Sequence, residues 1–151
     1  MSGEIQNRKA AHEYHILDSL ETGIELKGTE VKSLRAGKGD LTDSFAKIEK
    51  GQVWLYQFDI APYLHGNREN HEPKRPKKLL LHQNQIRKLF SEASLRGRAL
   101  IPLKGYFNQH GLFKIILAVG SGKALRDKRQ ATLEKETRRE LDRALKTRLK
   151  R

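Results

Sequence analysis

Two hairpin patterns constrain the fold of this chain more than any other feature of its sequence. In the first, residues 44–48 and 53–58 combine aromatic and β-branched residues and flank a short polar turn. In the second, apolar residues alternate along residues 98–107 and 112–119, on either side of a polar turn at residues 108–111. Both patterns predict pairs of antiparallel strands that follow each other directly in the chain.

Two shorter patterns predict helices. In residues 29–36, Thr29 is a candidate N-cap, Glu30 suits the positive end of a helix, Leu34 would face inward, and Gly37 is a natural stop. A second segment is also predicted to be an amphipathic helix, because its apolar residues fall on one helical face. That segment spans residues 84–94, and the face comprises Ile86, Leu89, Phe90 and Ala93.

The order of these elements favours a small, mainly β fold. Further short strands are expected at residues 12–19, 24–27 and 79–81, and residues 61–78 are expected to be irregular. The chain lacks the regular alternation of strand and helix that a doubly wound α/β sheet needs. We therefore predict a closed, antiparallel, OB-like (oligonucleotide-binding-type) barrel of about six strands with two or three flanking helices.

The charge of the chain is concentrated at its C-terminal end. The 151 residues carry 31 Lys/Arg and 18 Asp/Glu, a net charge of +13, and residues 123–151 alone carry 12 Lys/Arg and 5 Asp/Glu, a net charge of +7. We therefore divide the chain into an RNA-binding barrel at residues 1–121 and a basic tail at residues 122–151. Leucines spaced by four and acid-before-base pairs predict that the tail is disordered when free and helical on a partner.

Several classes of function find no support in the sequence. The chain has no cysteine, and its six histidines form no metal-binding motif, so no metal or other cofactor is expected. Gly120-Ser121-Gly122-Lys123 lacks the leading glycine of a phosphate loop and is interpreted as a turn that leaves the last strand. With no catalytic motif, apolar span or signal pattern, we expect a cytoplasmic, non-enzymatic protein that does not bind membranes.

Basic clusters outside the tail point to a nucleic-acid partner. They occur at Asn7-Arg8-Lys9, at Lys32 with Arg35, and at Lys74, Arg75, Lys77 and Lys78. Any one such cluster is ordinarily a solvated surface. Four of them, counting the tail, in one small chain favour RNA, which a barrel of this kind would recognise by shape and unstacked bases.

Several motifs in a fixed order resemble one protein family. They are Asn7-Arg8-Lys9-Ala10 with His12-Glu13-Tyr14, the run from Gly28 to Gly37, Asp43-Ser44-Phe45, Pro62-Tyr63, the segment from Arg75 to His82, and Asp127-Lys128-Arg129. Together they resemble the SsrA-binding proteins, the small protein B family. The match runs from Asn7 through the tail, and several motifs in order are far more specific than any single one.

The resemblance implies an adaptor for ribosome rescue. Family members bind the tRNA-like domain of transfer-messenger RNA and deliver it to ribosomes stalled on messages without a stop codon. The barrel is expected to replace the missing anticodon arm. The tail is expected to act in the vacant decoding site and the mRNA channel. Elongation factor Tu would join through the RNA complex, and the free protein is expected to be a monomer.

Site residues follow from the family pattern and from charge. By position, the RNA-binding surface would include Asn7, His12, Glu21, Leu80 and His82. Glu21 is expected in the turn before Gly23, and Leu80 could equally pack in the core. Charge adds Arg8, Lys9, Lys32, Arg35, Lys77, Lys78 and Lys114. The ribosome-binding candidates are Gly122, Lys123, Arg126, Asp127, Lys128 and Arg129.

The tail departs from the family pattern at two positions. Arg126 stands where members usually have an aromatic residue or histidine, and Thr137 stands where many have tryptophan. A guanidinium also stacks on bases, so Arg126 could retain the role with altered geometry.

Two other functions remain open from the residues alone. One is a general RNA-binding barrel or RNA chaperone without action on the ribosome, and the other is a basic ribonuclease. A ribonuclease would need a His/Lys or carboxylate pair at one site.

Overall fold

Six strands form a closed antiparallel ring in the computed structural model, which describes residues 4–65, 70–123 and 136–146. Within these residues the ring runs through β8 (Arg98–Phe107), β4 (Phe45–Glu49), β5 (Gln52–Tyr56), β7 (Lys77–Leu80), β2 (Tyr14–Ile24) and β9 (Phe113–Gly122). The pairing of β9 with β8 closes the ring. The predicted barrel and both predicted hairpins are confirmed.

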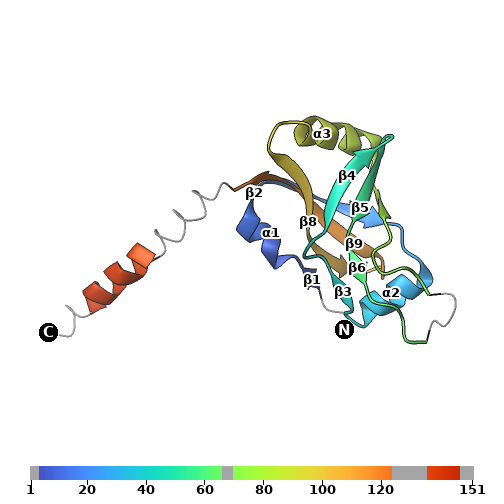
Figure 1. Ribbon diagram of the computed structural model, residues 1–151, viewed down its shortest axis with the longest axis horizontal. Coiled ribbons are helices and arrows are strands. Elements are labelled where there is room, and N and C mark those ends of the chain that lie inside the picture. The colour runs from blue at the N-terminus through green and yellow to red at the C-terminus, as the bar shows by residue number, and fades with distance from the viewer. Residues whose placement is uncertain (1–3, 66–69, 124–135, 147–151) are drawn as a thin grey trace.

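Smaller elements decorate the barrel. The short strand β1 (Ile5–Gln6) pairs with β8, and β3 (Gly39–Asp40) pairs with β6 (Asp59–Ile60). Three helices flank the strands: α1 (Arg8–Glu13), α2 (Gly28–Arg35) and α3 (Gln83–Ala93). Figure 1 shows α3 and α2 at opposite ends of the barrel and α1 beside β1.

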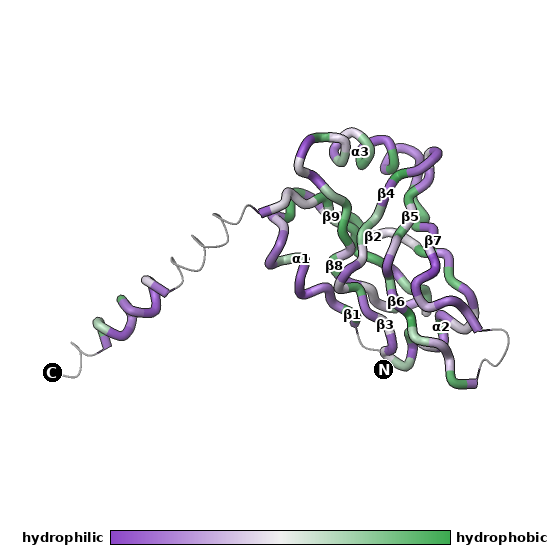
Figure 2. Tube along the Cα trace, viewed as in Figure 1, coloured by the Kyte–Doolittle hydropathy of each residue, from purple (hydrophilic) through white to green (hydrophobic). Residues whose placement is uncertain are grey.

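The barrel interior is filled by one face of each strand. Val53, Leu55, Leu79, Ile115 and Leu117 are all at most 1% exposed, and they alternate with residues that face outward. Figure 2 shows the resulting mixture of apolar and polar positions along the same strands. This alternation removes the apolar faces from water and fixes which side chains reach the outer surface.

The N-terminal part differs from the prediction, because residues 12 and 13 belong to a helix. The Asn7 side chain accepts a hydrogen bond from the Ala10 amide at 3.3 Å and donates one to the Pro102 carbonyl at 2.9 Å. This N-cap starts α1 and ties it to β8. Strand β2 then begins at Tyr14 and continues to Ile24, so the expected separate strand at residues 24–27 is wrong.

Both predicted helices are present with altered details. Helix α2 begins two residues earlier than expected, with Lys27 and not Thr29 as the N-cap. The Glu30 carboxylate accepts a hydrogen bond from the Lys27 amide at 2.7 Å. Gly37 has φ +74°, as the predicted helix stop requires. In α3, Ile86 and Leu89 are buried as predicted, but Phe90 is 59% exposed and does not join the core.

Strand β9 extends further than the sequence indicated. Gly120 and Gly122 pair with Ile16 and Tyr14 of β2, so the expected turn at residues 120–123 is wrong. Of the tail, residues 136–146 are helical and exposed. The predicted disorder concerns the whole tail, residues 122–151, and residues 124–135 and 147–151 of it lie outside the described residues. None of the helices described is both long and apolar enough to cross a membrane.

Candidate nucleic-acid interface

A row of outward-facing residues crosses four adjacent strands. Leu80 on β7 lies opposite Gly23 on β2, Gly23 lies opposite Lys114 on β9, and Lys114 lies opposite Tyr106 on β8. We call Leu80, Gly23, Lys114 and Tyr106 the Gly23 row. Leu80 is 48% exposed, so the alternative of plain core packing is wrong for this residue.

Gly23 forms a notch in this row. A Cβ atom at this position would lie 3.2 Å from the Leu80 Cβ, closer than most contacts of real side chains. Glycine therefore leaves the Leu80 side chain undisplaced and leaves the backbone of β2 open to a ligand. An exposed leucine beside bare backbone and a lysine suits the ribose and base faces of an RNA strand.

Glu21 lies beside the Gly23 row and is held by Tyr106. It is two residues from Gly23 on β2, not in a turn as expected from sequence, and it therefore shares the outer face. The Tyr106 hydroxyl donates a hydrogen bond to the Glu21 Oε2 atom. This bond to an anion stabilises the neutral phenol and raises the pKa of Tyr106 to about 12.

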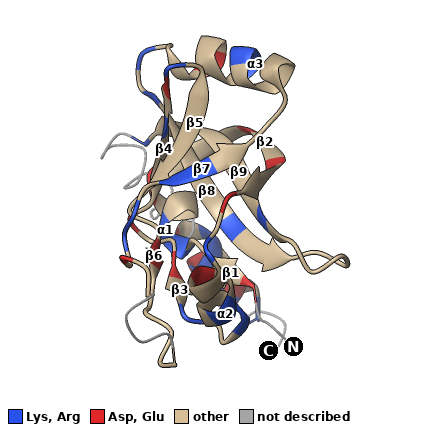
Figure 3. Cartoon of the chain, turned by 90° about the vertical axis from the view of Figure 1, so that its right-hand side faces the viewer, with Lys and Arg blue, Asp and Glu red and all other residues tan. Residues whose placement is uncertain are grey.

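Two further predicted residues adjoin the Gly23 row along β7. Lys78 is two residues from Leu80 and half-buried on the same outer face. His82 follows the strand as the N-cap residue of α3, and its amide donates to the Gln85 side chain at 3.0 Å. In Figure 3, β7 is marked as basic on the face turned toward the viewer, whereas its neighbours β5 and β2 contain no Lys or Arg. We call Glu21, Lys78, His82 and the Gly23 row the Gly23 face.

A second group of predicted residues lies at the other end of β2. Arg8, Lys9 and His12 are exposed on α1. The Lys123 amide donates to the Glu13 carbonyl at 2.9 Å, and its Nζ atom donates to the Ala11 carbonyl at 3.2 Å. We call Arg8, Lys9, His12, Gly122 and Lys123 the α1 group.

The α1 group is separate from the Gly23 face. Tyr14 and Gly23 are nine residues apart on one strand, which corresponds to about 30 Å of extended chain. The structure thus does not bring all the predicted RNA-binding residues together on one surface. Asn7 belongs to neither, because its buried side chain serves as the α1 cap.

The α2 residues occupy a third position. The Arg35 guanidinium lies 4.6 Å from the Phe107 ring centroid and 3.4 Å from the Gly111 carbonyl. The Lys32 Nζ atom lies 5.5 Å from the Tyr63 ring centroid. Both are exposed, and Arg35 lies beside the β8–β9 turn.

The prediction that Lys77 contacts RNA is wrong. Its side chain is fully buried, and Nζ donates to the Phe58 and Arg75 carbonyls at 2.7 and 2.9 Å. The Glu30 carboxylate, also fully buried, lies 3.8 Å from Nζ and accepts from the Arg75 guanidinium. Burial lowers the pKa of Lys77 to about 8. We call Glu30, Arg75 and Lys77 the Lys77 cluster.

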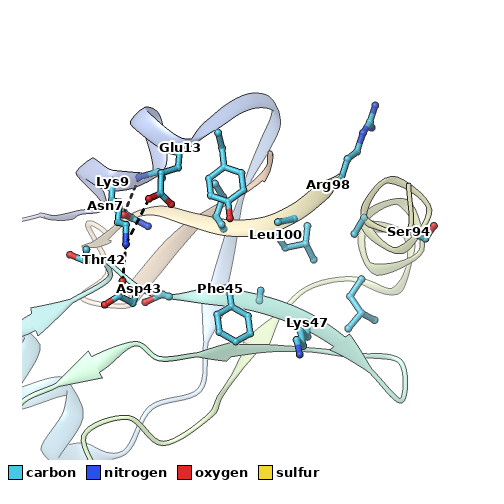
Figure 4. A pocket seen from close by; sticks show the side chains of 18 of the residues that line it. Asn7, Lys9, Glu13, Thr42, Asp43, Phe45, Lys47, Ser94, Arg98 and Leu100 are labelled. Atoms are coloured by element: carbon cyan, nitrogen blue, oxygen red, sulfur yellow. Dashed lines mark hydrogen bonds and ion pairs between the residues drawn. The ribbon is translucent and has the colours of Figure 1, made fainter. Parts of the chain in front are cut away.

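A groove of about 610 Å³ opens between β4 and β8, the two neighbouring strands of the ring that share the fewest paired residues. Strands β4 and β8 share the single pair Ala46 and Leu100, and the groove lies along this seam between α1 and α3. Figure 4 shows Lys9 between Glu13 and Asp43 at one end of the groove. The Lys9 Nζ atom is 3.2 Å from Asp43, and this hydrogen bond raises the pKa of Lys9.

The remaining predicted site residues are the ribosome-binding candidates of the tail. Arg126, Asp127, Lys128 and Arg129 lie outside the described residues. In the part of the chain that is described, no three His, Cys, Asp or Glu side chains come together as a metal site. Tyr106 was not predicted from the sequence, because its only local signal is an aromatic residue in a strand. The notch at Gly23 was not predicted either, although a glycine inside a strand pattern could have indicated it.

The closed barrel with its notched outer face places this chain among the small oligonucleotide-binding-type barrels. A family model described as SmpB protein matches residues 4–147, so the chain belongs to that family, and the resemblance is confirmed. The SsrA-binding protein of Desulforudis audaxviator is 54% identical over 139 residues, covering 92% of this chain and 90% of that relative.

Two further relatives agree with this assignment. The SsrA-binding protein of Pelotomaculum thermopropionicum is 52% identical over 145 residues, covering 96% of this chain and 94% of that relative. A solved structure described as "tmRNA-SmpB: a journey to the center of the bacterial ribosome" has a TM-score of 0.70 and 46% identity. It covers 85% of this chain and 94% of its own.

Proposed function

We propose that this chain binds transfer-messenger RNA through its barrel and delivers it to stalled ribosomes for trans-translation. The observation that carries the proposal is the Gly23 face, on which strands distant in sequence bring together an exposed leucine, a lysine and an oriented carboxylate. The relatives known as SsrA-binding proteins and the solved structure described as tmRNA-SmpB support the choice of RNA. The role is that of a binding protein rather than an enzyme.

Each part of the Gly23 face has a distinct task in this proposal. Leu80 offers apolar surface to a ribose or base, Lys114 neutralises a phosphate, and Glu21 accepts a hydrogen bond from a nucleotide donor. Because Glu21 repels phosphate, it contributes recognition, whereas the lysines contribute attraction that weakens with salt.

The α1 group has a different task. Lys123 is fixed to two carbonyls of α1, so the tail starts beside Arg8, Lys9 and His12. We assign this group, with Arg126 to Arg129, to the ribosomal decoding site, and the rest of the tail to the mRNA channel. This assignment moves Arg8, Lys9 and His12 from the RNA-binding surface expected from the sequence to the ribosome-binding one. Elongation factor Tu then joins through the RNA, and the free protein is a cytoplasmic monomer.

Truncation after Lys123 tests this division of tasks, because it removes the tail and leaves every barrel strand intact. We expect the truncated protein to retain its affinity for transfer-messenger RNA in filter binding and to lose all peptide tagging on stalled ribosomes. Equal loss of both activities would contradict the division. Equal affinity for transfer-messenger RNA and for unrelated RNA of the same length would instead favour a general RNA chaperone.

A further inference from the structure

The hydrogen bond between Tyr106 and Glu21 is unusual because it passes over an intervening strand. Tyr106 is on β8 and Glu21 is on β2, and β9 lies between them in the sheet. Two strand spacings separate the backbones by about 9.5 Å, a gap that only two long side chains can bridge. The bridge crosses β9 beside Lys114, so it borders the Gly23 notch.

Tyr106 leaves part of the carboxylate available. Its hydroxyl binds the Oε2 atom, while a carboxylate offers acceptor sites on both oxygens. Glu21 is exposed, so its Oε1 atom can accept a hydrogen bond from a ligand at the notch. Because the bond raises the pKa of Tyr106 to about 12, the phenol stays protonated and remains a donor at neutral pH.

A basic side chain lies over the Tyr106 ring. The Lys104 Nζ atom lies 5.5 Å from the ring centroid and 3.5 Å from the Glu4 carboxylate. Without the hydrogen bond from Tyr106, the Glu21 side chain on an open strand face would have to be ordered each time RNA bound, at an entropic cost to affinity. Pre-ordering removes that cost.

We propose that Tyr106 is a positioning residue for RNA recognition, holding Glu21 beside Gly23 so that its free oxygen accepts a hydrogen bond from a nucleotide. The donor is either a ribose 2′-hydroxyl or the exocyclic amino group of a guanine base. This inference rests on the proposed function, and it adds a residue and a chemical group to the barrel's RNA surface.

A double-mutant cycle on the full-length protein tests the proposal. Tyr106→Phe should weaken binding of transfer-messenger RNA by about threefold to tenfold, and Glu21→Gln should weaken it at least as much. The double variant should be no weaker than Glu21→Gln alone, because Tyr106 acts through Glu21. Additive losses, or an unchanged affinity for Tyr106→Phe, would overturn the proposal.

A matched control separates positioning from stability. Tyr56→Phe removes a similar hydrogen bond, from the Tyr56 hydroxyl to Glu49 at 2.9 Å, on β5 and β4, away from the Gly23 row. It should leave RNA affinity unchanged. Tyr106→Phe should also keep the wild-type salt slope of binding, since no charge is lost. A fall in RNA affinity for Tyr56→Phe as large as that for Tyr106→Phe would refute the positioning role.

Nucleotide-analogue interference distinguishes the two donors. Transfer-messenger RNA carrying scattered 2′-deoxy nucleotides tests the ribose, and inosine in place of guanosine tests the exocyclic amino group. One interference site should be present with wild-type protein and absent with both Glu21→Gln and Tyr106→Phe. If no site behaves in this way, the inference fails. If wild-type protein shows no preference for this RNA at all, the proposed function fails instead.

Discussion

The Lys77 cluster and the Gly23 face use similar residues for opposite purposes. Both combine a glutamate with basic residues, and strand β7 contributes to both. Lys77 points into the protein, where Glu30 and backbone carbonyls satisfy it, whereas Lys78 and Leu80 point outward. One step along a pleated strand thus separates a group that stabilises the fold from groups available to RNA. The comparison teaches that residue type alone does not identify a binding lysine.

The largest expected effect is a loss of stability when the buried Lys77 is replaced. Lys77→Met removes one partner of a buried ion pair and leaves carbonyl acceptors without a donor, so it should lower the free energy of unfolding by about 3–5 kcal/mol. Urea unfolding measures this loss. The adjacent control, Lys78→Met, should change stability by about 0.5 kcal/mol or less. Similar stability losses for the two variants would break the distinction between the neighbours.

The pH dependence of stability gives a second readout of the same variant. Burial lowers the pKa of Lys77 to about 8 in the folded protein, from 10.5 for an unperturbed lysine. Between these values the unfolded chain binds more protons than the folded chain, so rising pH favours folding. The stability of wild type relative to Lys77→Met should therefore increase from pH 8 to pH 10.5. A constant difference would show that Lys77 does not titrate in this range.

An intermediate effect is expected at the notch of the Gly23 face. Gly23→Val places a side chain where even a Cβ would lie 3.2 Å from Leu80, and it fills the open space above β2. We expect affinity for transfer-messenger RNA to fall by about tenfold or more, with a stability loss of about 1–3 kcal/mol from overpacking. Filter binding at a temperature where the variant is folded, as judged by circular dichroism, separates the two losses. Unchanged affinity would remove Gly23 from the interface.

The smallest expected effect concerns a single charge on the same face. Lys114→Gln should weaken binding modestly and reduce the slope of log affinity against log salt by about 1, as the loss of one phosphate contact requires. Titrations at several salt concentrations measure the slope. Lys47→Gln on β4 is the matched control, since Lys47 is exposed on a strand outside the Gly23 row. Equal slopes for wild type and Lys114→Gln would exclude a phosphate contact by Lys114.

Local patterns predicted much of the fold and only part of the site. The hairpins of β4–β5 and β8–β9 were predictable because each pairs neighbouring segments across a turn. The start of β2 was not, because the Asn7 cap of α1 depends on a carbonyl of Pro102, far along the chain. Likewise, Tyr106 carried no signal of its own, since its partner Glu21 lies two strands away.

The sequence by itself determined the alternation of the strands, the two amphipathic helices, the basic character of the tail and the family, because these depend on residue order alone. Only the tertiary structure decided that Lys77 is buried while Lys78 is not, and that Leu80, Gly23 and Lys114 form one row. The physical reason is that barrel closure pairs strands distant in the chain. Their register, which local periodicity does not encode, sets which outward-facing side chains become neighbours.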